Sequence, residues 1–267
     1  MKKTFIALVV AASAAVSVSA MAAGWEQNGS GGSVDMSGTL TPVEKVTPWE
    51  VKVGDAVTGL DAQIQKDQSV VSIQPKQSIL ALGIRTTINK AFTGQSGIAP
   101  QIDFNNAIDL NGFENGGTTL TLDVKDETGS NKIGTLTAPF NTAAAGSITG
   151  STNISDRYGY MSANTVNNNT RGFAGGLATN WDKINKNPLP TLNALSSEIM
   201  AKFDPQNMSI SNSGFSNNFA DSKARYSAAY GAGILTTDTI TIKLDTPAAG
   251  DAPVQWKASL PVTVTYL

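Results

Sequence analysis

The N-terminal part of the chain contains a short stretch that alternates apolar and polar residues and has no obvious partner strand nearby. Every second residue of positions 33–40 is apolar or glycine, namely Val34, Met36, Gly38 and Leu40. This is the period of a β-strand with one buried face. The next strand-like segment begins at Trp49, beyond Pro42 and Pro48, which disfavours a tight hairpin between the two. We therefore interpret residues 33–40 as a strand that is given to another molecule.

The first 22 residues have the features of a secretory signal peptide. Lys2 and Lys3 form a charged start, a mostly apolar run extends from residue 5 to about residue 18, and Ala20-Met21-Ala22 fits a small-x-small cleavage site. We therefore predict a mature chain that begins at Ala23. No later stretch reaches the roughly 18 uninterrupted apolar residues that a membrane-spanning helix needs.

The composition excludes several classes of function. The chain has no histidine and no cysteine, which removes histidine-dependent catalytic triads and every metal site built on those two residue types. A net charge of −2 argues against a nucleic-acid partner, because phosphate binding needs clustered Lys and Arg. Carboxylate pairs such as Asp103 with Asp109 have no distinctive spacing and are interpreted as solvated turn residues. We predict no enzyme activity, no cofactor and no metal.

The rest of the chain is predicted to be mainly β. Alternating or β-rich runs occupy residues 49–53, 70–73, 78–84, 120–124, 133–140, 225–235, 238–244 and 254–267, with a hairpin connection at about 126–132. The expected fold is a β-sandwich with these apolar stripes in its core. Gly231-Ala232-Gly233 lies inside one of these strands and lacks the third glycine and the following helix of a nucleotide loop.

The pattern breaks between Ala143 and about Pro190, where polar loops are expected. A helix is then predicted over residues 191–203, with Thr191 as its cap and Asp204-Pro205 at its end. Its apolar positions fall at spacings of three and four: Leu192, Leu195, Ile199 and Phe203.

The last strand alternates almost to the end of the chain. Its apolar row is Leu260, Val262, Val264 and Tyr266. Two interpretations stay open. The strand is held by its neighbours like any other, or it borders a gap and is grasped by a strand of another protein during export.

Several short matches, taken in order, resemble a known family. They are Gly32-Ser33-Val34-Asp35-Met36-Ser37-Gly38, Trp49-Glu50-Val51-Lys52-Val53-Gly54, Ile79-Leu80 with Arg85, Gly175-Gly176-Leu177, Tyr226 to Ile234, and Gln255-Trp256 before Leu260 to Tyr266. In this combination the chain resembles the major fimbrial subunits of the K88 type, which enteric bacteria assemble by the chaperone-usher route.

The resemblance implies an incomplete immunoglobulin-like β-sandwich over residues 43–267. Residues 23–42 would be an extension that completes the sandwich of the next subunit. The implied donor residues are Val34, Met36, Gly38 and Leu40, and the implied acceptor-groove and chaperone contacts are Leu260, Val262, Val264 and Tyr266. The implied partners are other copies of the subunit, a periplasmic chaperone, an outer-membrane usher and a host glycoconjugate receptor. The implied location is a fimbria on the cell surface, reached through the periplasm.

The resemblance also implies that the subunit is itself an adhesin, with a receptor-binding insertion at about residues 145–222. Aromatic faces pack on the apolar faces of sugar rings, and Asn and Arg hydrogen-bond to sugar hydroxyls. The residues of this region with that chemistry are Arg157, Tyr158, Tyr160, Arg171, Phe173 and Trp181.

The main alternative is an outer-membrane β-barrel protein. Such a protein would share the leader, the lack of cysteine, the many glycines and the alternating C-terminal strand. The low aromatic content of 7%, the predicted helix and the final residue, Leu267, weigh against it.

Overall fold

The computed structural model describes residues 27–28, 34, 36–41, 46–164, 171–250 and 252–267. The predicted signal peptide, residues 1–22, lies outside this described part. The chain divides into two units, Met1–Lys45 and Val46–Leu267, and each is considered by itself.

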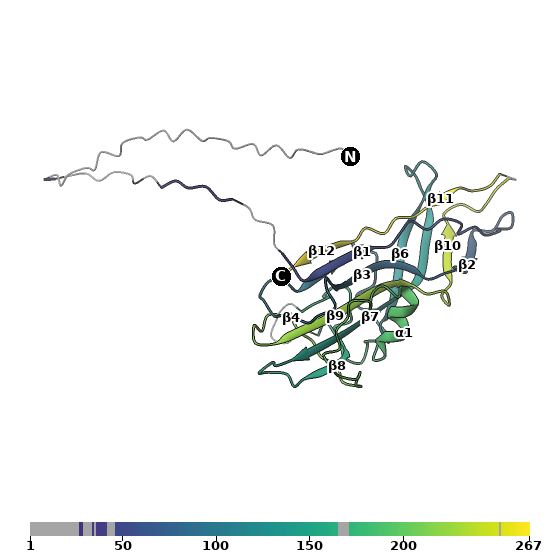
Figure 1. Cartoon of the computed structure of the whole chain (residues 1–267). Coiled ribbons are helices and arrows are strands. Elements are labelled where there is room, and N and C mark those ends of the chain that lie inside the picture. Colours follow the sequence, from purple (N-terminus) through teal and green to yellow (C-terminus); the bar gives the residue numbers. More distant parts are fainter. Residues whose placement is uncertain (1–26, 29–33, 35, 42–45, 165–170, 251) are drawn as a thin grey trace, which may run out of the picture. The chain divides into compact units, whose positions relative to one another are not determined.

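The body, Val46–Leu267, is mainly β and confirms the predicted fold class, a β-sandwich with a small helix (Figure 1). Its elements are β1 (Trp49–Val53), β2 (Val70–Ile73), β3 (Ile79–Thr86), β4 (Phe92–Thr93), β5 (Pro100–Asp103), β6 (Gly117–Asp126), β7 (Lys132–Thr149), β8 (Arg157–Tyr160), α1 (Pro188–Leu195), β9 (Arg225–Ile234), β10 (Ile240–Leu244), β11 (Trp256–Lys257) and β12 (Thr263–Tyr266). In the part of the chain that the structure describes, no helix is long and apolar enough to cross a bilayer.

The large sheet is antiparallel and has the order β1-β3-β9-β7-β10-β2, with β4, β6, β8 and β11 joined to it at the sides. The central strand is β7, which pairs with β6 and β10 through its first half and with β9 and β8 through its second half. The predicted loss of strand structure at Ala143 is wrong, because β7 continues to Thr149. Residues 142–148 are all buried because both faces of the strand are covered, so they show no apolar–polar alternation, and all but Ile148 are small.

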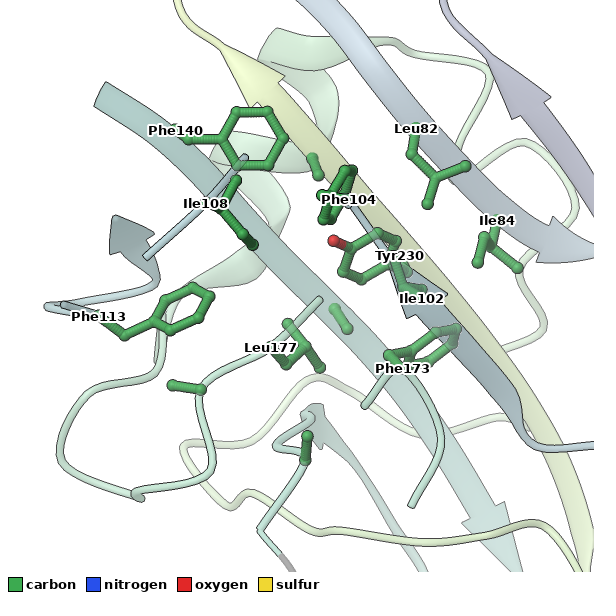
Figure 2. Packing of buried hydrophobic residues seen from close by; sticks show 14 of the residues in the cluster. Leu82, Ile84, Ile102, Phe104, Ile108, Phe113, Phe140, Phe173, Leu177 and Tyr230 are labelled. Atoms are coloured by element: carbon green, nitrogen blue, oxygen red, sulfur yellow. The ribbon is translucent and has the colours of Figure 1, made fainter. Parts of the chain in front are cut away.

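A second, two-stranded sheet of β5 and β12 packs over the core. Figure 2 shows Ile102 of β5 and Phe104, the residue after β5, beside Tyr230 of β9, with Leu82 of β3 nearby. Trp49 adds edge-on contacts with Phe92, Phe173 and Phe219. The residues between the two sheets therefore form one continuous apolar cluster.

The helix differs from its prediction in both bounds. It begins at Pro188 and ends at Leu195, so Thr191 lies inside it and does not cap it. Proline is accepted in the first turn of a helix, where the missing N–H has no partner to lose. After Ser196 the chain continues in turns closed by bonds between residues three apart, which keep Ile199 and Phe203 on the buried side with the helix.

Helix α1 packs on the outer face of β7 and β9, where the sheet carries only small side chains (Figure 1). Leu195, Ala145 and Ala229 belong to this second apolar cluster. Gly231 and Gly233 belong to the same surface. A Cβ at Gly233 would clash with the carbonyl oxygen of Ile79 and with the side chain of Leu195. Gly231 is therefore explained by the close approach of α1 and the turn after it, and Gly233 by the close approach of both the β3 backbone and the helix.

This packing predicts that Gly233→Ala lowers the free energy of unfolding by about 1–3 kcal/mol, the usual cost of overpacking. The matched control is Gly83→Ala on the neighbouring strand, where an added Cβ would meet Ile199 at an ordinary 3.5 Å and should be tolerated. Urea unfolding of the two variants measures the difference. Equal stability of both variants would contradict this account of the packing at Gly233.

Candidate functional site

The body contains a long apolar groove with a volume of about 1350 Å³. One wall is formed by residues 53–66, which follow β1. The other wall is formed by residues 252–260 and Val262, which precede β12. The floor is the sandwich core itself, with side chains from the four strands β2, β6, β7 and β10: Ile73, Leu120, Leu122, Leu136, Phe140, Ile240, Ile242 and Leu244. An apolar core that is open along a groove lacks a covering element.

The edge of β1 on the groove side has no partner. In an antiparallel pair, alternate residues bond to the neighbouring strand, and those between them turn their N–H and C=O groups the other way. The N–H of Gly54 donates to the carbonyl of Ala81 at 3.2 Å, in register with the β1–β3 ladder. Val51 and Val53 therefore direct their backbone groups away from β3. Among the described residues, no strand pairs with that edge.

The side chains of Val51 and Val53 also indicate that a covering element is missing. They share the face of β1 from which Trp49 enters the core, yet both are exposed, whereas Trp49 is buried. Residues on the core face of a strand are exposed only where nothing lies over them. The exposed side chains therefore mark the place of the missing cover.

The opposite side of β1 is firmly held. Glu50 accepts hydrogen bonds from Lys202 at 2.5 Å and from Arg85 at 2.9 Å, and these contacts hold the pKa of its carboxyl below the usual value. Lys52 pairs with Glu198 at 2.8 Å. The pairs with Lys202 and Glu198 connect β1 to the turns after α1, while the backbone ladder with β3 holds the strand in place although its groove side is unpaired.

The C-terminal strand β12 presents a second open edge. Ala99 and Leu267 exchange both backbone hydrogen bonds, at 3.0 and 3.1 Å, in register with the β5–β12 ladder. Val264 and Tyr266 therefore turn their backbone groups to the side away from β5. No other strand in the described part of the body pairs with β12.

The predicted groove residues fall into two pairs. Leu260 and Val262 line the groove, whereas Val264 and Tyr266 lie on β12 and pack half-buried against the core. The predicted strand over residues 254–267 is too long, because only β11 and β12 are strands. Pro261 lies between them and cannot donate to a ladder.

The described part of the extension has no strand or helix of its own. Val34, Met36 and Leu40 are 86%, 92% and 97% exposed. These three large apolar side chains are thus available to a partner. The backbone of Gly38 is also accessible, because a Cβ added there would have no atom within 4 Å.

Two of the six predicted glycan-binding residues belong to the core. Phe173 is 0% exposed and stacks on Tyr230 at a centroid distance of 5.3 Å. Tyr158 is buried against Phe203 at 4.9 Å, and burial raises the pKa of its hydroxyl. Neither ring offers a face to a ligand in this structure.

The other four residues lie at different places. Arg157 and Tyr160 both contact the segment at Ser213 and Gly214. Arg157 donates to the hydroxyl of Ser213 at 3.2 Å and to the carbonyl of Gly214. The Cα of Gly214 lies against the Tyr160 ring. Arg171 is half-buried beside Gln101, whose side chain donates to its carbonyl. Trp181 is 36% exposed on a separate turn. The structure therefore does not gather the six residues into one site.

The groove wall at residues 54–66 was absent from the sequence-based prediction. A signal was available, because Leu60, Ala62 and Ile64 alternate with Asp61, Gln63 and Gln65. The floor residues were predicted only as sandwich core. Their second role arises because the core is open, which no local pattern reveals.

Comparison with known proteins agrees with these features. The whole chain, residues 1–267, matches the K88 family described as fimbrial, major and minor subunit. The F41 fimbrial protein of Escherichia coli is 29% identical over 287 aligned residues, which cover 100% of both chains. The chain therefore belongs to the K88-type family of fimbrial major and minor subunits, and it is a structural subunit that polymerises with other subunits in a surface fimbria.

Proposed function

We propose that this chain is a major subunit that polymerises by donor-strand exchange. Residues 33–40 of one copy enter the groove of another copy and complete its sandwich. The single observation that carries this proposal is the presence in one chain of an apolar groove, whose walls continue from two strands with unpaired edges, and of an exposed segment with alternating apolar residues. Each supplies what the other lacks.

The energetics favour this pairing. Burial of Val34, Met36 and Leu40 contributes roughly 1.5–3 kcal/mol each, or about 5–9 kcal/mol before the ordering of the segment is subtracted. Backbone hydrogen bonds to the open edges add to this. Gly38 supplies no burial and fits a shallow point of the groove, where a side chain would clash. Donor and groove are different surfaces, so the contact repeats without closing and yields a filament.

The empty groove also supports a role for a chaperone during export. Unpaired edges beside exposed apolar side chains such as Val53, Val57 and Val254 form a template for aggregation. In the proposed pathway a periplasmic chaperone covers the groove until an outer-membrane usher passes the subunit to the fibre. The predicted signal peptide is consistent with this route.

Adhesion is a second proposed function of the same chain. The observation that favours it is Trp181, a large aromatic ring that is exposed on a turn among polar groups. Its neighbours in the sequence, Asn180 and Asp182, and the nearby Lys183, which pairs with Glu114, can hydrogen-bond to sugar hydroxyls. The proposed receptor is a host glycan, with Arg157, Tyr160 and Arg171 as further candidate contacts.

The donor role predicts that Met36→Asp abolishes fibre formation, because it places a charge on the face that enters the groove. Ser37→Asp is the matched control, since it adds the same charge one residue later on the opposite face, and it should leave fibre yield close to that of the parent. Electron microscopy and the amount of sheared surface polymer measure the outcome. Normal fibres from Met36→Asp would refute the donor role.

The groove predicts that Val262→Asp weakens binding of a synthetic peptide with the sequence of residues 33–40. The loss of one buried apolar contact corresponds to about 1.5–3 kcal/mol, or roughly 10- to 150-fold in Kd. Thr263→Asp, on the exposed face of the same segment, should change Kd little. Fluorescence anisotropy gives the affinities, and circular dichroism checks that both variants fold. Equal affinities would count against the groove as acceptor.

The adhesin proposal predicts that the subunit, with its groove filled by the donor peptide, binds a defined set of sugars on a glycan array. Trp181→Ala should lower the affinity for those sugars by roughly two- to tenfold, because a stacking face is lost. Ile88→Ala removes another exposed apolar side chain and serves as the control. Absence of glycan binding by the parent subunit would leave it a shaft protein without adhesive function.

A further inference from the structure

In the described part of the chain, Trp49 is the first buried residue after the extension, since Val46 is exposed and the two residues between them are half-buried. Its indole N–H donates to the carbonyl oxygen of Ile98 at 2.6 Å, inside the core. Three phenylalanine rings contact the indole edge-on, at centroid distances of 5.1 to 5.9 Å: Phe92, Phe173 and Phe219. We name Trp49, Ile98 and these three phenylalanines the Trp49 socket.

Two rings of the socket belong to residues with a left-handed backbone. Phe173 has φ +63° and Phe219 has φ +59°. For a bulky aromatic residue this conformation is an outlier, and it persists only where the surrounding structure holds the residue in place. Both rings are nevertheless buried against the indole. The chain therefore accepts backbone strain at two separate places, and at both the strained residue contacts Trp49.

The two strained segments also hold each other. The N–H of Gly172 donates to the carbonyl of Asn217 at 2.9 Å, and a Cβ at Gly172 would clash with the ring of Phe219. The N–H of Phe173 donates to the carbonyl of Pro100, in β5, at 2.7 Å. The side-chain oxygen of Asn217 accepts the N–H of Phe219 at 2.6 Å. Residues that lie far apart in the sequence thus form one connected wall around the indole.

The place of the socket in the chain indicates what it does. The extension is continuous with the body through Val46, so a pull on residues 33–40 reaches the body at the start of β1. Among the described residues, this edge strand of five residues pairs only with β3. Strand ends open first unless further contacts hold them. The chain contains no cysteine, so no disulfide can carry the load, and Trp49 is the residue at that end.

On the basis of the proposed donor-strand mechanism, which fixes residues 33–40 of each subunit in another copy, we propose that the Trp49 socket is the tension anchor of the subunit. When the fibre is stretched, the load enters the body at β1, and the socket keeps the first residue of that strand in the core. Phe173 and Phe219 come from the segment between β8 and β9. That segment therefore has a mechanical role in the shaft, independent of any receptor.

The test applies a constant force to single molecules of the full mature chain carrying Met36→Asp, which prevents polymerisation. The molecules are held through Ser37→Cys in the extension and Thr137→Cys, an exposed position on the central strand β7. Because the chain has no cysteine of its own, both attachments are specific. A second pair of attachments replaces Ser37→Cys by Thr265→Cys, so that the load enters through β12 instead of β1.

We expect Phe219→Leu to shorten the lifetime of the body under force roughly tenfold when it is pulled through residue 37, because edge-on contacts with the loaded indole are lost. Phe113→Leu, the same change in a buried ring outside the socket, should alter this lifetime by less than about twofold. Pulled through residue 265, the two variants should have equal lifetimes. Phe92→Leu removes a half-buried ring of the socket and replaces Phe219→Leu if that variant does not fold.

The two proposals fail in different ways. Equal lifetimes of the socket and control variants when pulled through residue 37, or the same shortening from both attachments, would overturn the tension anchor and leave donor-strand exchange intact. Normal fibres from Met36→Asp would remove the load that the anchor resists, and would overturn both proposals. Urea unfolding of each variant shows whether a change in lifetime exceeds the change in overall stability, as the anchor requires.

Discussion

Two unpaired strand edges beside an open apolar core determine how this subunit behaves. A backbone N–H or C=O group that is removed from water without a partner costs free energy, and so does an apolar floor left in contact with water. The body therefore has a groove in which one added strand would relieve both costs, as we propose. Val34, Met36 and Leu40, exposed on an unpaired extension, have the spacing that such a strand requires. In the proposed mechanism, the fold is complete only when a second molecule contributes to it.

The outer face of the large sheet, by contrast, is covered. β7 and β9 are buried on both faces, by the sandwich core on one face and by α1 on the other. Small residues such as Ala145 and Gly233 make that second contact possible. Ion pairs from Glu50 and Lys52 attach the edge strand β1 to the turns after α1. The part of the segment between β8 and β9 that contains α1 thus packs on the outer face of β7 and β9, whereas Phe173 and Phe219 of the same segment belong to the sandwich core.

The alternation of residues 34–40 and 260–266 could be read from the sequence, because half-buried strands separate apolar and polar side chains. The continuation of β7 past Ala143 could not, since a strand buried on both faces by small residues has no alternation. The start of the helix was missed because Pro188 lies in its first turn, where proline is tolerated. An aromatic residue such as Phe173 gives no sign of whether its ring faces a ligand or the core. Family membership decided between the fimbrial and outer-membrane interpretations.

The central claim is that the donor segment of one copy fills the groove of the next copy. Mixing two defective subunits tests this claim most directly. One has a disabled donor segment and an intact groove, and the other has an intact donor segment and a disabled groove. Native mass spectrometry of each alone and of the mixture gives the stoichiometry. The account predicts monomers of each variant alone and 1:1 heterodimers, without longer polymers, in the mixture. Polymers from either variant alone, or no heterodimer from two folded partners, would contradict it.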